Sequence, residues 1–431
     1  MKSDETLISP AQSAIASGEP VPRVVMVAAY RFPHGDAMSN RLLQLARSAT
    51  PPGATTVIVN DWPGTDRPPE PVALPPGLRL ITLFAAGGGG RLRRWVRRQS
   101  RPLRVLRALR RAGIPTGEIT GICLPLGLWN LSTWIVLRLT VRCPLTVDVL
   151  ERHEPGQFRH GRLTPYFIRH RWHSLLADRL ADQVIAISTT LHRRLARPNR
   201  PILVVPPQVD RADYRQPAPP SLTNGLRLLY AGTAGPKDRL AVVLEGIRRL
   251  PEPERQRVRL TVAGMTREQT AAMSDLDEGV VADLAEQIVF LGRVSRDRVL
   301  AELRAAHFSV LVRPSGGYAE AGFPSKVPES LAAGCPVLLN HTSDLATYIG
   351  DGREGIVLAG PGADDVRDGL VRALTLNDAQ WWQMSHHARE RASTFDYRTW
   401  APVVSAFVAG RRSSQDQVSG PGGVHPQRRE Q

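Results

Sequence analysis

Lysine is almost missing from this 431-residue chain, although the chain is strongly basic. Arginine supplies 53 of the 56 basic residues, and the lysines are Lys2, Lys237 and Lys326. An ammonium group is a compact point charge that can approach one phosphate oxygen from a crowded direction, whereas a guanidinium is a planar fork. Where arginine is the default basic residue, a lysine in the folded body therefore indicates a position that needs a compact charge.

Cysteines and long apolar runs are also scarce. The three cysteines follow neither a disulfide pattern nor a metal-ligand spacing, which is typical of a reducing cytoplasm. The N-terminal segment contains acids and no apolar core, so it does not resemble a signal peptide. The longest apolar run, 122–139, is broken by proline, glycine and asparagine, and its unbroken part is too short to span a bilayer. We expect a cytoplasmic protein, with peripheral contact with the membrane as one alternative.

The net charge of +16 favours anionic partners. Residues 91–111 contain ten arginines and no acid, with apolar residues at helical spacing. Two interpretations stay open, because such a segment can lie on an anionic membrane surface or can be a solvated arginine-rich face with its leucines in the core. Nucleic acid is not expected as a partner, since no recognition module or interleaved aromatic residues accompany the basic residues.

Short apolar, β-branched runs alternate with helical patterns along most of the chain, as in parallel sheets covered by helices on both faces. Strands are expected first at 24–29, 55–60, 78–83, 118–124, 144–150, 183–188 and 202–206. After a Pro-rich connector at 216–225, they are expected at 226–232, 259–264, 287–292, 308–312, 336–340 and 355–360. The sequence therefore predicts an α/β fold with two tandem Rossmann-like, doubly wound domains.

The domain bounds follow from this alternation. We expect a disordered N-terminus over 1–20, a first α/β domain over 21–217, a second α/β domain over 218–395, a terminal helix over 396–410 and a disordered tail over 411–431. A return of the terminal helix to the first domain is left open. Ligands of open α/β sheets bind beyond the carboxyl ends of the strands, so two such sheets that face one another would place ligands in a central cleft.

The first candidate motif is YAGTAGPKDRLAVVLEGIRRL, residues 230–250. It predicts a strand, a glycine-containing turn with Gly232 and Lys237, and a helix that opens at about Asp238. Small residues let an anion approach the backbone, and the start of a helix adds free N–H groups and partial positive charge. The alternative is an ordinary strand–helix turn with a surface lysine.

The second motif is RPSGGYAEAGFPSKVPESLAAGCPV, residues 313–337. A Gly-rich loop follows a strand and leads into a helix from about Ser325, a plausible N-cap, to Ala333. Lys326 stands where the helix dipole disfavours a cation unless an anion compensates it. Glu329 follows one turn later and can accept both hydroxyls of a ribose. Alternatively, Glu329 is a partner of the helix dipole and Lys326 is solvated.

Other carboxylates are candidate catalytic or metal-binding groups. Asp148 and Glu151 end an expected strand near the presumed cleft and are candidates for orienting a bound substrate, although such pairs are often polar loop residues. Asp275 and Asp277 spell an Asp-x-Asp signature, which we interpret as a solvated turn. No cluster of ligand residues predicts a metal.

These motifs resemble those of retaining glycosyltransferases with the GT-B fold, the group that includes glycogen synthases. AGFPSKVPESLAAGCPVLLNHTSDL resembles the family's nucleotide-sugar loop, and YAGTAGPKDRLAVVLEGI resembles its diphosphate-binding strand–turn–helix. The resemblance extends over roughly 23–410, and the Phe-Pro-Ser-Lys loop is similar to that of one subgroup. Near the N-terminus, FPHGDAMSNRLLQLA stands where the family has a Gly-rich first loop.

The resemblance implies that 21–217 form an N-terminal acceptor-binding domain and that 218–395 form a C-terminal nucleotide-sugar-binding domain. In the first domain, Asp148 and Glu151 would orient the acceptor hydroxyl or the donor sugar.

The resemblance also implies roles for individual residues of the second domain. Lys237 and Lys326 would contact the donor diphosphate, and Glu329 would hold the ribose. Loop residues would hold phosphate at the start of the helix or line the donor site. His34 and Gly35 of the first loop are candidates for approaching the sugar or phosphate, and the alternative is a histidine in a surface turn. These loop positions are Gly232, Thr233, Gly322, Phe323, Pro324 and Ser325.

Two positions depart from the family's pattern. Thr233 stands where most members have arginine, and Ala321 stands where many have a second glutamate, with Glu320 one residue out of register. The donor sugar therefore stays open.

The resemblance implies a metal-independent glycosyltransferase with no cofactor. It would move a sugar from a nucleoside diphosphate donor to a hydroxyl of a glycan, glycolipid or secondary metabolite in a bacterium, with retention. Preorganised positive charge would stabilise the leaving nucleoside diphosphate. The alternatives are a nucleotide-sugar epimerase of the same fold and a protein that binds nucleotide sugar or membrane without catalysis.

Overall fold

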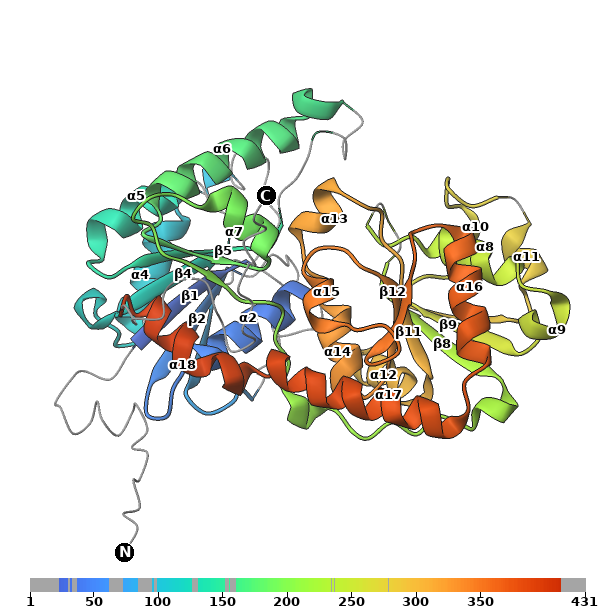
Figure 1. Ribbon diagram of the computed structural model, residues 1–431. Coiled ribbons are helices and arrows are strands. Elements are labelled where there is room, and N and C mark those ends of the chain that lie inside the picture. Colours follow the sequence, from blue (N-terminus) through green and yellow to red (C-terminus); the bar gives the residue numbers. More distant parts are fainter. Residues whose placement is uncertain are drawn as a thin grey trace, which may run out of the picture. The chain divides into compact units, whose positions relative to one another are not determined.

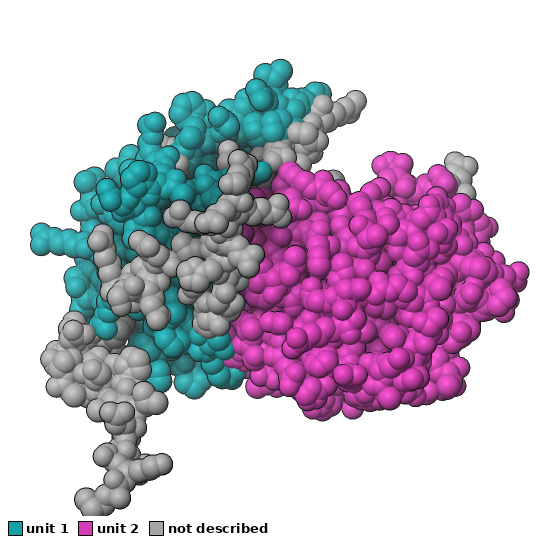
Figure 2. Space-filling model, viewed as in Figure 1, with its two compact units in different colours: residues 1–187, 191–205, 397–431 teal, residues 188–190, 206–396 magenta. Residues whose placement is uncertain are grey.

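The computed structural model describes the folded body of the chain (Figure 1). The described residues are 23–29, 32, 37–61, 73–83, 95–96, 99–125, 131–151, 155, 160–233, 235, 237–277 and 279–411. They form two compact units, coloured separately in Figure 2. Unit 1 consists of the residues up to 187, residues 191–205 and the residues from 397 onward. Unit 2 consists of residues 188–190 and 206–396.

Unit 1 is built on a seven-stranded parallel sheet among its described residues. The strands are β1 (Arg23–Ala28), β2 (Thr55–Asp61), β3 (Leu78–Leu83), β4 (Gly121–Pro125), β5 (Leu145–Val149), β6 (Gln183–Ala186) and β7 (Ile202–Val204). Their order across the sheet is β3-β2-β1-β4-β5-β6-β7. Successive strands are therefore added toward one edge from β1 to β3 and toward the other edge from β4 onward, and all of them stay parallel. The strands at the centre are buried on both faces, which explains why their sequences read as continuous apolar runs.

Helices cover both faces of this sheet. They are α2 (Ala37–Ser48), α4 (Arg101–Arg111), α5 (Leu131–Thr140), α6 (Pro165–Leu180), α7 (Thr189–Leu195) and α18 (Tyr397–Val408), with 3₁₀ turns η1 (Thr116–Glu118) and η3 (Gly161–Leu163). Figure 1 shows α5 and α6 on one face of the sheet and α2 and α18 on the other. The buried side chains of α2 and α18, among them Leu45, Trp400 and Phe407, form one apolar cluster with Met26 of β1.

Unit 2 has a six-stranded parallel sheet of the same kind among its described residues. Its strands are β8 (Leu226–Ala231), β9 (Val258–Ala263), β10 (Ile288–Gly292), β11 (Phe308–Leu311), β12 (Val337–Asn340) and β13 (Gly355–Leu358), in the order β10-β9-β8-β11-β12-β13. Every strand expected from the sequence is therefore present. The expected strand at 118–124 begins later, at Gly121, because Thr116–Glu118 form η1.

Each strand of unit 2 is followed by one or two helices. They are α8 (Leu240–Arg248), α9 (Glu252–Arg255), α10 (Arg267–Ala271), α11 (Val280–Asp283), α12 (Arg296–Ala305), α13 (Gly317–Ala321), α14 (Lys326–Ala332), α15 (Leu345–Tyr348), α16 (Ala363–Leu374) and α17 (Asp378–Arg391), with 3₁₀ turns η4 (Arg211–Asp213), η5 (Leu222–Asn224) and η6 (Ala392–Phe395). Side-chain caps start several of them: Thr266 and Asn377 form capping boxes with Gln269 and Gln380.

No helix in the described ranges is both long enough and apolar enough to cross a membrane. The expected α/β class with two doubly wound sheets is confirmed by the strand orders of the two units.

Candidate functional site

The two sequence motifs of unit 2 meet at Lys326. This residue is the first of α14, and its ammonium group lies against Gly232, where β8 gives way to the turn before α8. A Cβ built on Gly232 would lie 2.5 Å from Nζ of Lys326, and the φ of Gly232 is +139°, a value that side-chain-bearing residues rarely adopt. Glycine at this position therefore leaves the space that the lysine occupies.

The ammonium group is fixed by Asp238. Nζ of Lys326 donates to Oδ2 of Asp238, and the guanidinium Nε of Arg313 donates to Oδ1 of the same carboxylate at 2.9 Å. Both Asp238 and Arg313 are buried, whereas 24% of the Lys326 side chain stays exposed. The carboxylate of Asp238 thus pairs with two cations, so the three side chains together carry a net positive charge. The part of this cluster that is most exposed to solvent is Lys326.

Burial and charge act in opposite directions on this cluster. Burial alone would raise the pKa of Asp238, but Lys326 and Arg313 outweigh it and lower that pKa below its ordinary value. Burial also lowers the pKa of Lys326, and the attraction of Asp238 opposes that effect. The aromatic ring of Tyr230 lies 5.1 Å from Nζ and adds a cation–π contact.

Arg313 is itself held from the neighbouring strand. Its backbone N–H donates to Oδ1 of Asn340 at 2.9 Å, and Nδ2 of Asn340 donates to its carbonyl oxygen at the same distance. Arg313 follows β11 and Asn340 ends β12, which pair in the sheet. The carboxyl ends of β8, β11 and β12 therefore build one polar cluster.

Lys237 lies in the turn that precedes Asp238. The backbone groups of Gly235 and Asp238 bond to each other in both directions across this turn, with N···O distances of 3.1 and 3.5 Å. The side chain of Lys237 is half-buried, and Thr233 is exposed. The helix begins at Leu240, two residues after the expected start at Asp238.

Glu329 lies one turn along α14, on a second polar cluster. Its Oε1 is 3.9 Å from a guanidinium nitrogen of Arg296, at the start of α12. Arg296 also donates to the hydroxyl of Tyr214 at 3.3 Å and lies 3.7 Å from a carboxylate oxygen of Asp213. Burial, and next to it the charge of Glu329, raises the pKa of Tyr214, so its hydroxyl keeps its proton.

The loop before α14 is packed rather than open. Gly322, Phe323 and Pro324 are buried, and the Phe323 ring packs edge-on against Tyr348 at 5.6 Å between ring centroids. Ser325 is half-buried and occupies the N-cap position, but its side chain makes no capping hydrogen bond. Glu320, just before this loop, accepts the backbone N–H of Ser343 at 2.8 Å.

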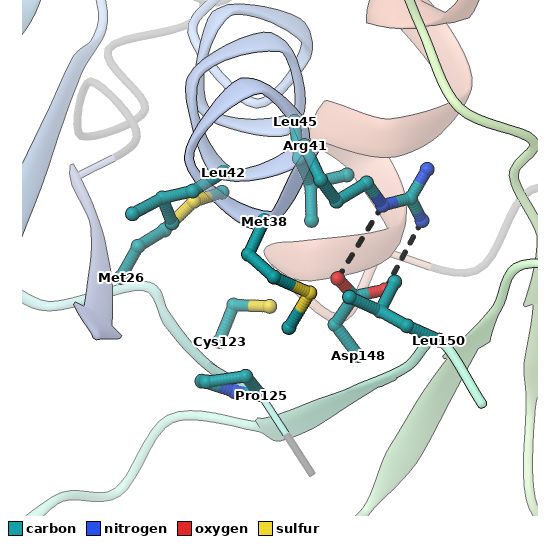
Figure 3. A pocket seen from close by; sticks show the side chains of 9 residues that line it. All are labelled: Met26, Met38, Arg41, Leu42, Leu45, Cys123, Pro125, Asp148 and Leu150. Atoms are coloured by element: carbon teal, nitrogen blue, oxygen red, sulfur yellow. Dashed lines mark hydrogen bonds and ion pairs between the residues drawn. The ribbon is translucent and has the colours of Figure 1, made fainter. Parts of the chain in front are cut away.

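In unit 1, Asp148 belongs to a buried ion pair. Its carboxylate accepts two hydrogen bonds from Arg41 of α2, at 3.0 and 3.4 Å, and Arg41 also donates to the carbonyl oxygen of Val205 at 2.9 Å. Figure 3 shows this pair at the wall of a small pocket with an otherwise largely apolar lining. The lining residues are Met26, Met38, Arg41, Leu42, Leu45, Cys123, Pro125, Asp148 and Leu150.

The other residues predicted in unit 1 are placed only in part. Glu151 is half-buried just beyond β5. His34 and Gly35 lie outside the described residues. The arrangement thus gives Asp148 a structural partner, and the catalytic roles predicted for Asp148 and Glu151 stay predictions.

The arginine-rich segment is divided between core and surface. Val105, Leu106 and Leu109 of α4 are buried, whereas Trp95 and Leu103 are more than half exposed. Arg101 and Arg104 pair with the buried carboxylate of Asp61. Much of the apolar face of α4 is therefore part of the core of unit 1.

Metal ligands do not gather in the part of the chain that the structure describes: it contains no group of three or more His, Cys, Asp or Glu side chains that could hold an ion. Asp275 and Asp277 are exposed in the turn between α10 and α11.

The comparison with family models bears on unit 2. Residues 225–375 match the family described as Glycosyl transferases group 1. The matched range contains the whole Gly232, Asp238, Arg313 and Lys326 cluster together with Glu329. The comparison with curated proteins found no similar sequence.

Solved structures resemble the whole two-unit chain. Sucrose-phosphate synthase from Thermosynechococcus elongatus is similar with a TM-score of 0.65 and 16% identity, over 90% of this chain and 98% of that one. HepE from Anabaena, solved in complex with UDP and glucose, gives 0.60 and 14% over 90% and 100%. WaaG, a glycosyltransferase involved in lipopolysaccharide biosynthesis, gives 0.61 and 16% over 90% and 100%. At these identities the likeness shows the fold, which is that of GT-B glycosyltransferases.

Sequence reasoning missed three residues of the candidate site: Asp238, Arg313 and Arg296. Asp238 and Arg313 stand inside the two quoted motifs, Asp238 at an expected helix start and Arg313 directly after an expected strand, so their positions were a usable signal. Arg296 had a weaker signal, because nothing in its own segment connects it to Glu329.

Proposed function

We propose that this protein is a glycosyltransferase that moves a sugar from a nucleoside-diphosphate sugar to a hydroxyl acceptor. The observation that carries the proposal is the meeting of the two motifs at Lys326, which lies over Gly232 and is joined to Asp238. The family match over 225–375 and the GT-B fold support the same conclusion. HepE, one of the similar structures, was solved with UDP-glucose.

In this proposal, Lys326 and Lys237 stabilise the negative charge that develops on the departing nucleoside diphosphate. The cluster supplies a positive charge that is already oriented, because Asp238 and Arg313 hold the ammonium group before a ligand arrives. Backbone groups at Gly232 and Thr233 and around Gly322 to Ser325 complete the phosphate contacts. Transfer would need no metal, since the lysines take the place of a bridging cation.

Glu329 is proposed to accept the hydroxyls of the donor ribose. Arg296 then acts as a positioning residue, because its guanidinium draws the carboxylate of Glu329 toward Tyr214 and Asp213. Unit 1 is proposed to hold the acceptor, with Asp148 and Glu151 as candidate contacts. Retention of configuration, a hexosyl donor and a bacterial glycan, glycolipid or secondary metabolite as acceptor are carried over from the resemblance.

The first test is calorimetric binding of UDP, GDP, ADP and TDP, each without metal. We expect one of them to bind wild type, and Lys326→Ala and Glu329→Ala to weaken binding by at least about tenfold each, as expected when one partner of a charge-assisted contact is removed. Glu302→Ala is the matched control. Glu302 pairs with Arg298 within α12 at 2.6 Å, outside the two motifs, so its loss should leave binding unchanged.

The same preparation separates the alternatives. Binding together with transfer of sugar to an added acceptor supports the glycosyltransferase. Turnover of the nucleotide sugar without acceptor, with inversion at one sugar carbon, identifies an epimerase instead. If no diphosphate binds at millimolar concentration, the role of the lysine cluster as a phosphate site is refuted.

A further inference from the structure

Exposed apolar side chains are concentrated in one part of unit 1. Among the described residues, ten of the thirteen large apolar side chains that are substantially exposed lie between Trp95 and Leu175. The other three, Val289, Val371 and Trp382, are scattered over a strand and two helices of unit 2. A grouping of this kind marks an interaction surface, whereas single exposed apolar residues are normal.

The clearest part of this surface is a stripe on α6. Ile168, Trp172 and Leu175 are spaced four and three residues apart, so they lie on one side of the helix. Their exposed fractions are 42%, 62% and 42%. We name these three residues the α6 stripe.

The opposite side of α6 is mixed. Phe167 is buried, and His170, Ser174 and Leu180 are half-buried, so the helix packs on unit 1 through this inner side. A helix that only covered a soluble core would carry polar residues on its outer side. The exposed apolar residues on the outer side of α6 are expected when that side also meets an apolar phase.

The surroundings of the stripe are basic. The helices α4, α5 and α6 together contain nine arginines and a single acid, Asp178. Helical geometry places Arg179 on the line of the stripe, one turn beyond Leu175, and Arg171 beside it. Both arginines are exposed. Tryptophan and arginine around an apolar stripe are the composition of helices that lie in the headgroup layer of an anionic bilayer.

We propose that the α6 stripe docks on the surface of a bilayer that contains anionic lipids. The 16 residues of α6 are too few to span the hydrocarbon core, so the helix would lie in the plane of the interface. The stripe would enter the boundary between headgroups and acyl chains, while Arg171 and Arg179 contact lipid phosphates. The α6 stripe itself lies outside 91–111, whose α4 has Val105, Leu106 and Leu109 in the core. The proposal does not depend on the function proposed above.

The test is co-sedimentation of the full-length protein with vesicles of phosphatidylcholine, alone or mixed with phosphatidylglycerol. We expect binding to the mixed vesicles and a loss of about tenfold or more in Trp172→Glu, because a charge replaces the largest group of the stripe. Trp382→Glu is the matched control: Trp382 is 47% exposed on α17 of unit 2, and its replacement should leave vesicle binding unchanged. Thermal unfolding of both variants checks that they fold.

A second variant tests the charges without touching the apolar side chains. Arg171→Gln combined with Arg179→Gln should weaken binding to the mixed vesicles by about thirtyfold, which corresponds to roughly 1 kcal/mol per arginine, and added salt should also weaken binding. The proposal is overturned if wild type does not bind the mixed vesicles, or if the Trp172 and Trp382 variants lose binding equally. It is also overturned if the stripe instead drives self-association, seen as a dimer that Trp172→Glu dissolves.

Discussion

At the scale of single residues, the space around Lys326 explains why this position holds a lysine in a chain that otherwise almost always uses arginine. Its ammonium group lies between the backbone of Gly232, the carboxylate of Asp238 and the ring of Tyr230. A guanidinium has a planar group several ångströms wide and would not fit where even a Cβ on Gly232 is too close. The arginine of the cluster, Arg313, is instead on the buried side, where its planar fork binds carboxylate and is held by Asn340.

This account predicts the effect of Gly232→Ala. The new methyl group would displace the ammonium of Lys326, so we expect affinity for the nucleoside diphosphate to fall by about tenfold, the loss of one charge-assisted contact. Isothermal titration calorimetry measures it. Gly117→Ala, in η1 of unit 1, is the control, because a Cβ there meets nothing within 4 Å and the residue lies outside both motifs.

A double-mutant cycle sharpens the result. In a Lys326→Ala background, Gly232→Ala should have little further effect on affinity, since the displaced group is already absent. Additive losses would show that Gly232 acts through backbone strain alone and not through the lysine.

At the scale of elements, His307 connects three segments of unit 2. Its Nδ1 accepts the backbone N–H of Arg227 in β8 at 2.9 Å, and its Nε2 donates to the carbonyl oxygen of Pro220 at 2.7 Å. Trp381 of α17 donates to the carbonyl oxygen of His307 at 2.8 Å, and the two rings meet edge to face. This pattern requires the neutral ring, because a protonated Nδ1 cannot accept.

The stability of unit 2 should therefore depend on pH through His307. Burial lowers the pKa of His307 below the usual 6.5, so the unfolded chain takes up a proton at a higher pH than the folded chain does. Stability is complete above pH 6.5 and falls as the pH drops from there toward the folded-state pKa, by up to about 1.4 kcal/mol per pH unit. Urea unfolding of wild type and His307→Asn between pH 7.5 and 5 measures this slope.

The variant should be less stable at pH 7.5 and should lose less stability on acidification. His386→Gln serves as the control, because His386 is exposed on α17 and its loss should leave the slope unchanged. Equal slopes in wild type and His307→Asn would contradict the assignment.

Much of the element-level structure could be predicted from the sequence, because parallel strands buried on both faces leave continuous apolar runs. The two motifs of unit 2 were also recognisable, since each joins a strand end, glycines and a helix start. The contact between the two motifs was harder to predict from the sequence. Asp238 and Arg313 meet because β11 pairs with β8, and strand order across a sheet is not encoded in any local pattern. The pairing of Asp148 with Arg41 could not be predicted either, because α2 and β5 are far apart in the sequence and no local pattern connects them.

At the scale of the whole molecule, α18 is the last helix of the described residues, and it belongs to unit 1. After the long passage through unit 2, α18 returns to unit 1 and buries Trp400, Val404 and Phe407 against α2 and the sheet. Gln183 of β6 donates to the carbonyl oxygen of Phe407 at 2.6 Å, which ties the end of the helix to the sheet. Unit 1 is therefore completed only when the last segment of the chain is in place.

The contact between β4 and α18 is close enough to test with one methyl group. A Cβ built on Gly121 would overlap the carbonyl oxygen of Val408, so Gly121→Ala should push α18 away from the sheet. We expect a loss of about 1–3 kcal/mol in the free energy of unfolding of unit 1, the usual cost of overpacking. Gly117→Ala is the matched control, because a Cβ there meets nothing within 4 Å.

Hydrogen exchange followed by mass spectrometry separates the two units. In Gly121→Ala, amides of α2, β4 and α18 should exchange faster, while those of β8, β11 and α14 keep their protection and the affinity for nucleoside diphosphate stays unchanged. This outcome follows because the apolar clusters of the two units are built from different residues. Equal loss of protection in β8 and β11 would show instead that the two sheets unfold as one cooperative body, and that α18 supports the donor site as well as unit 1.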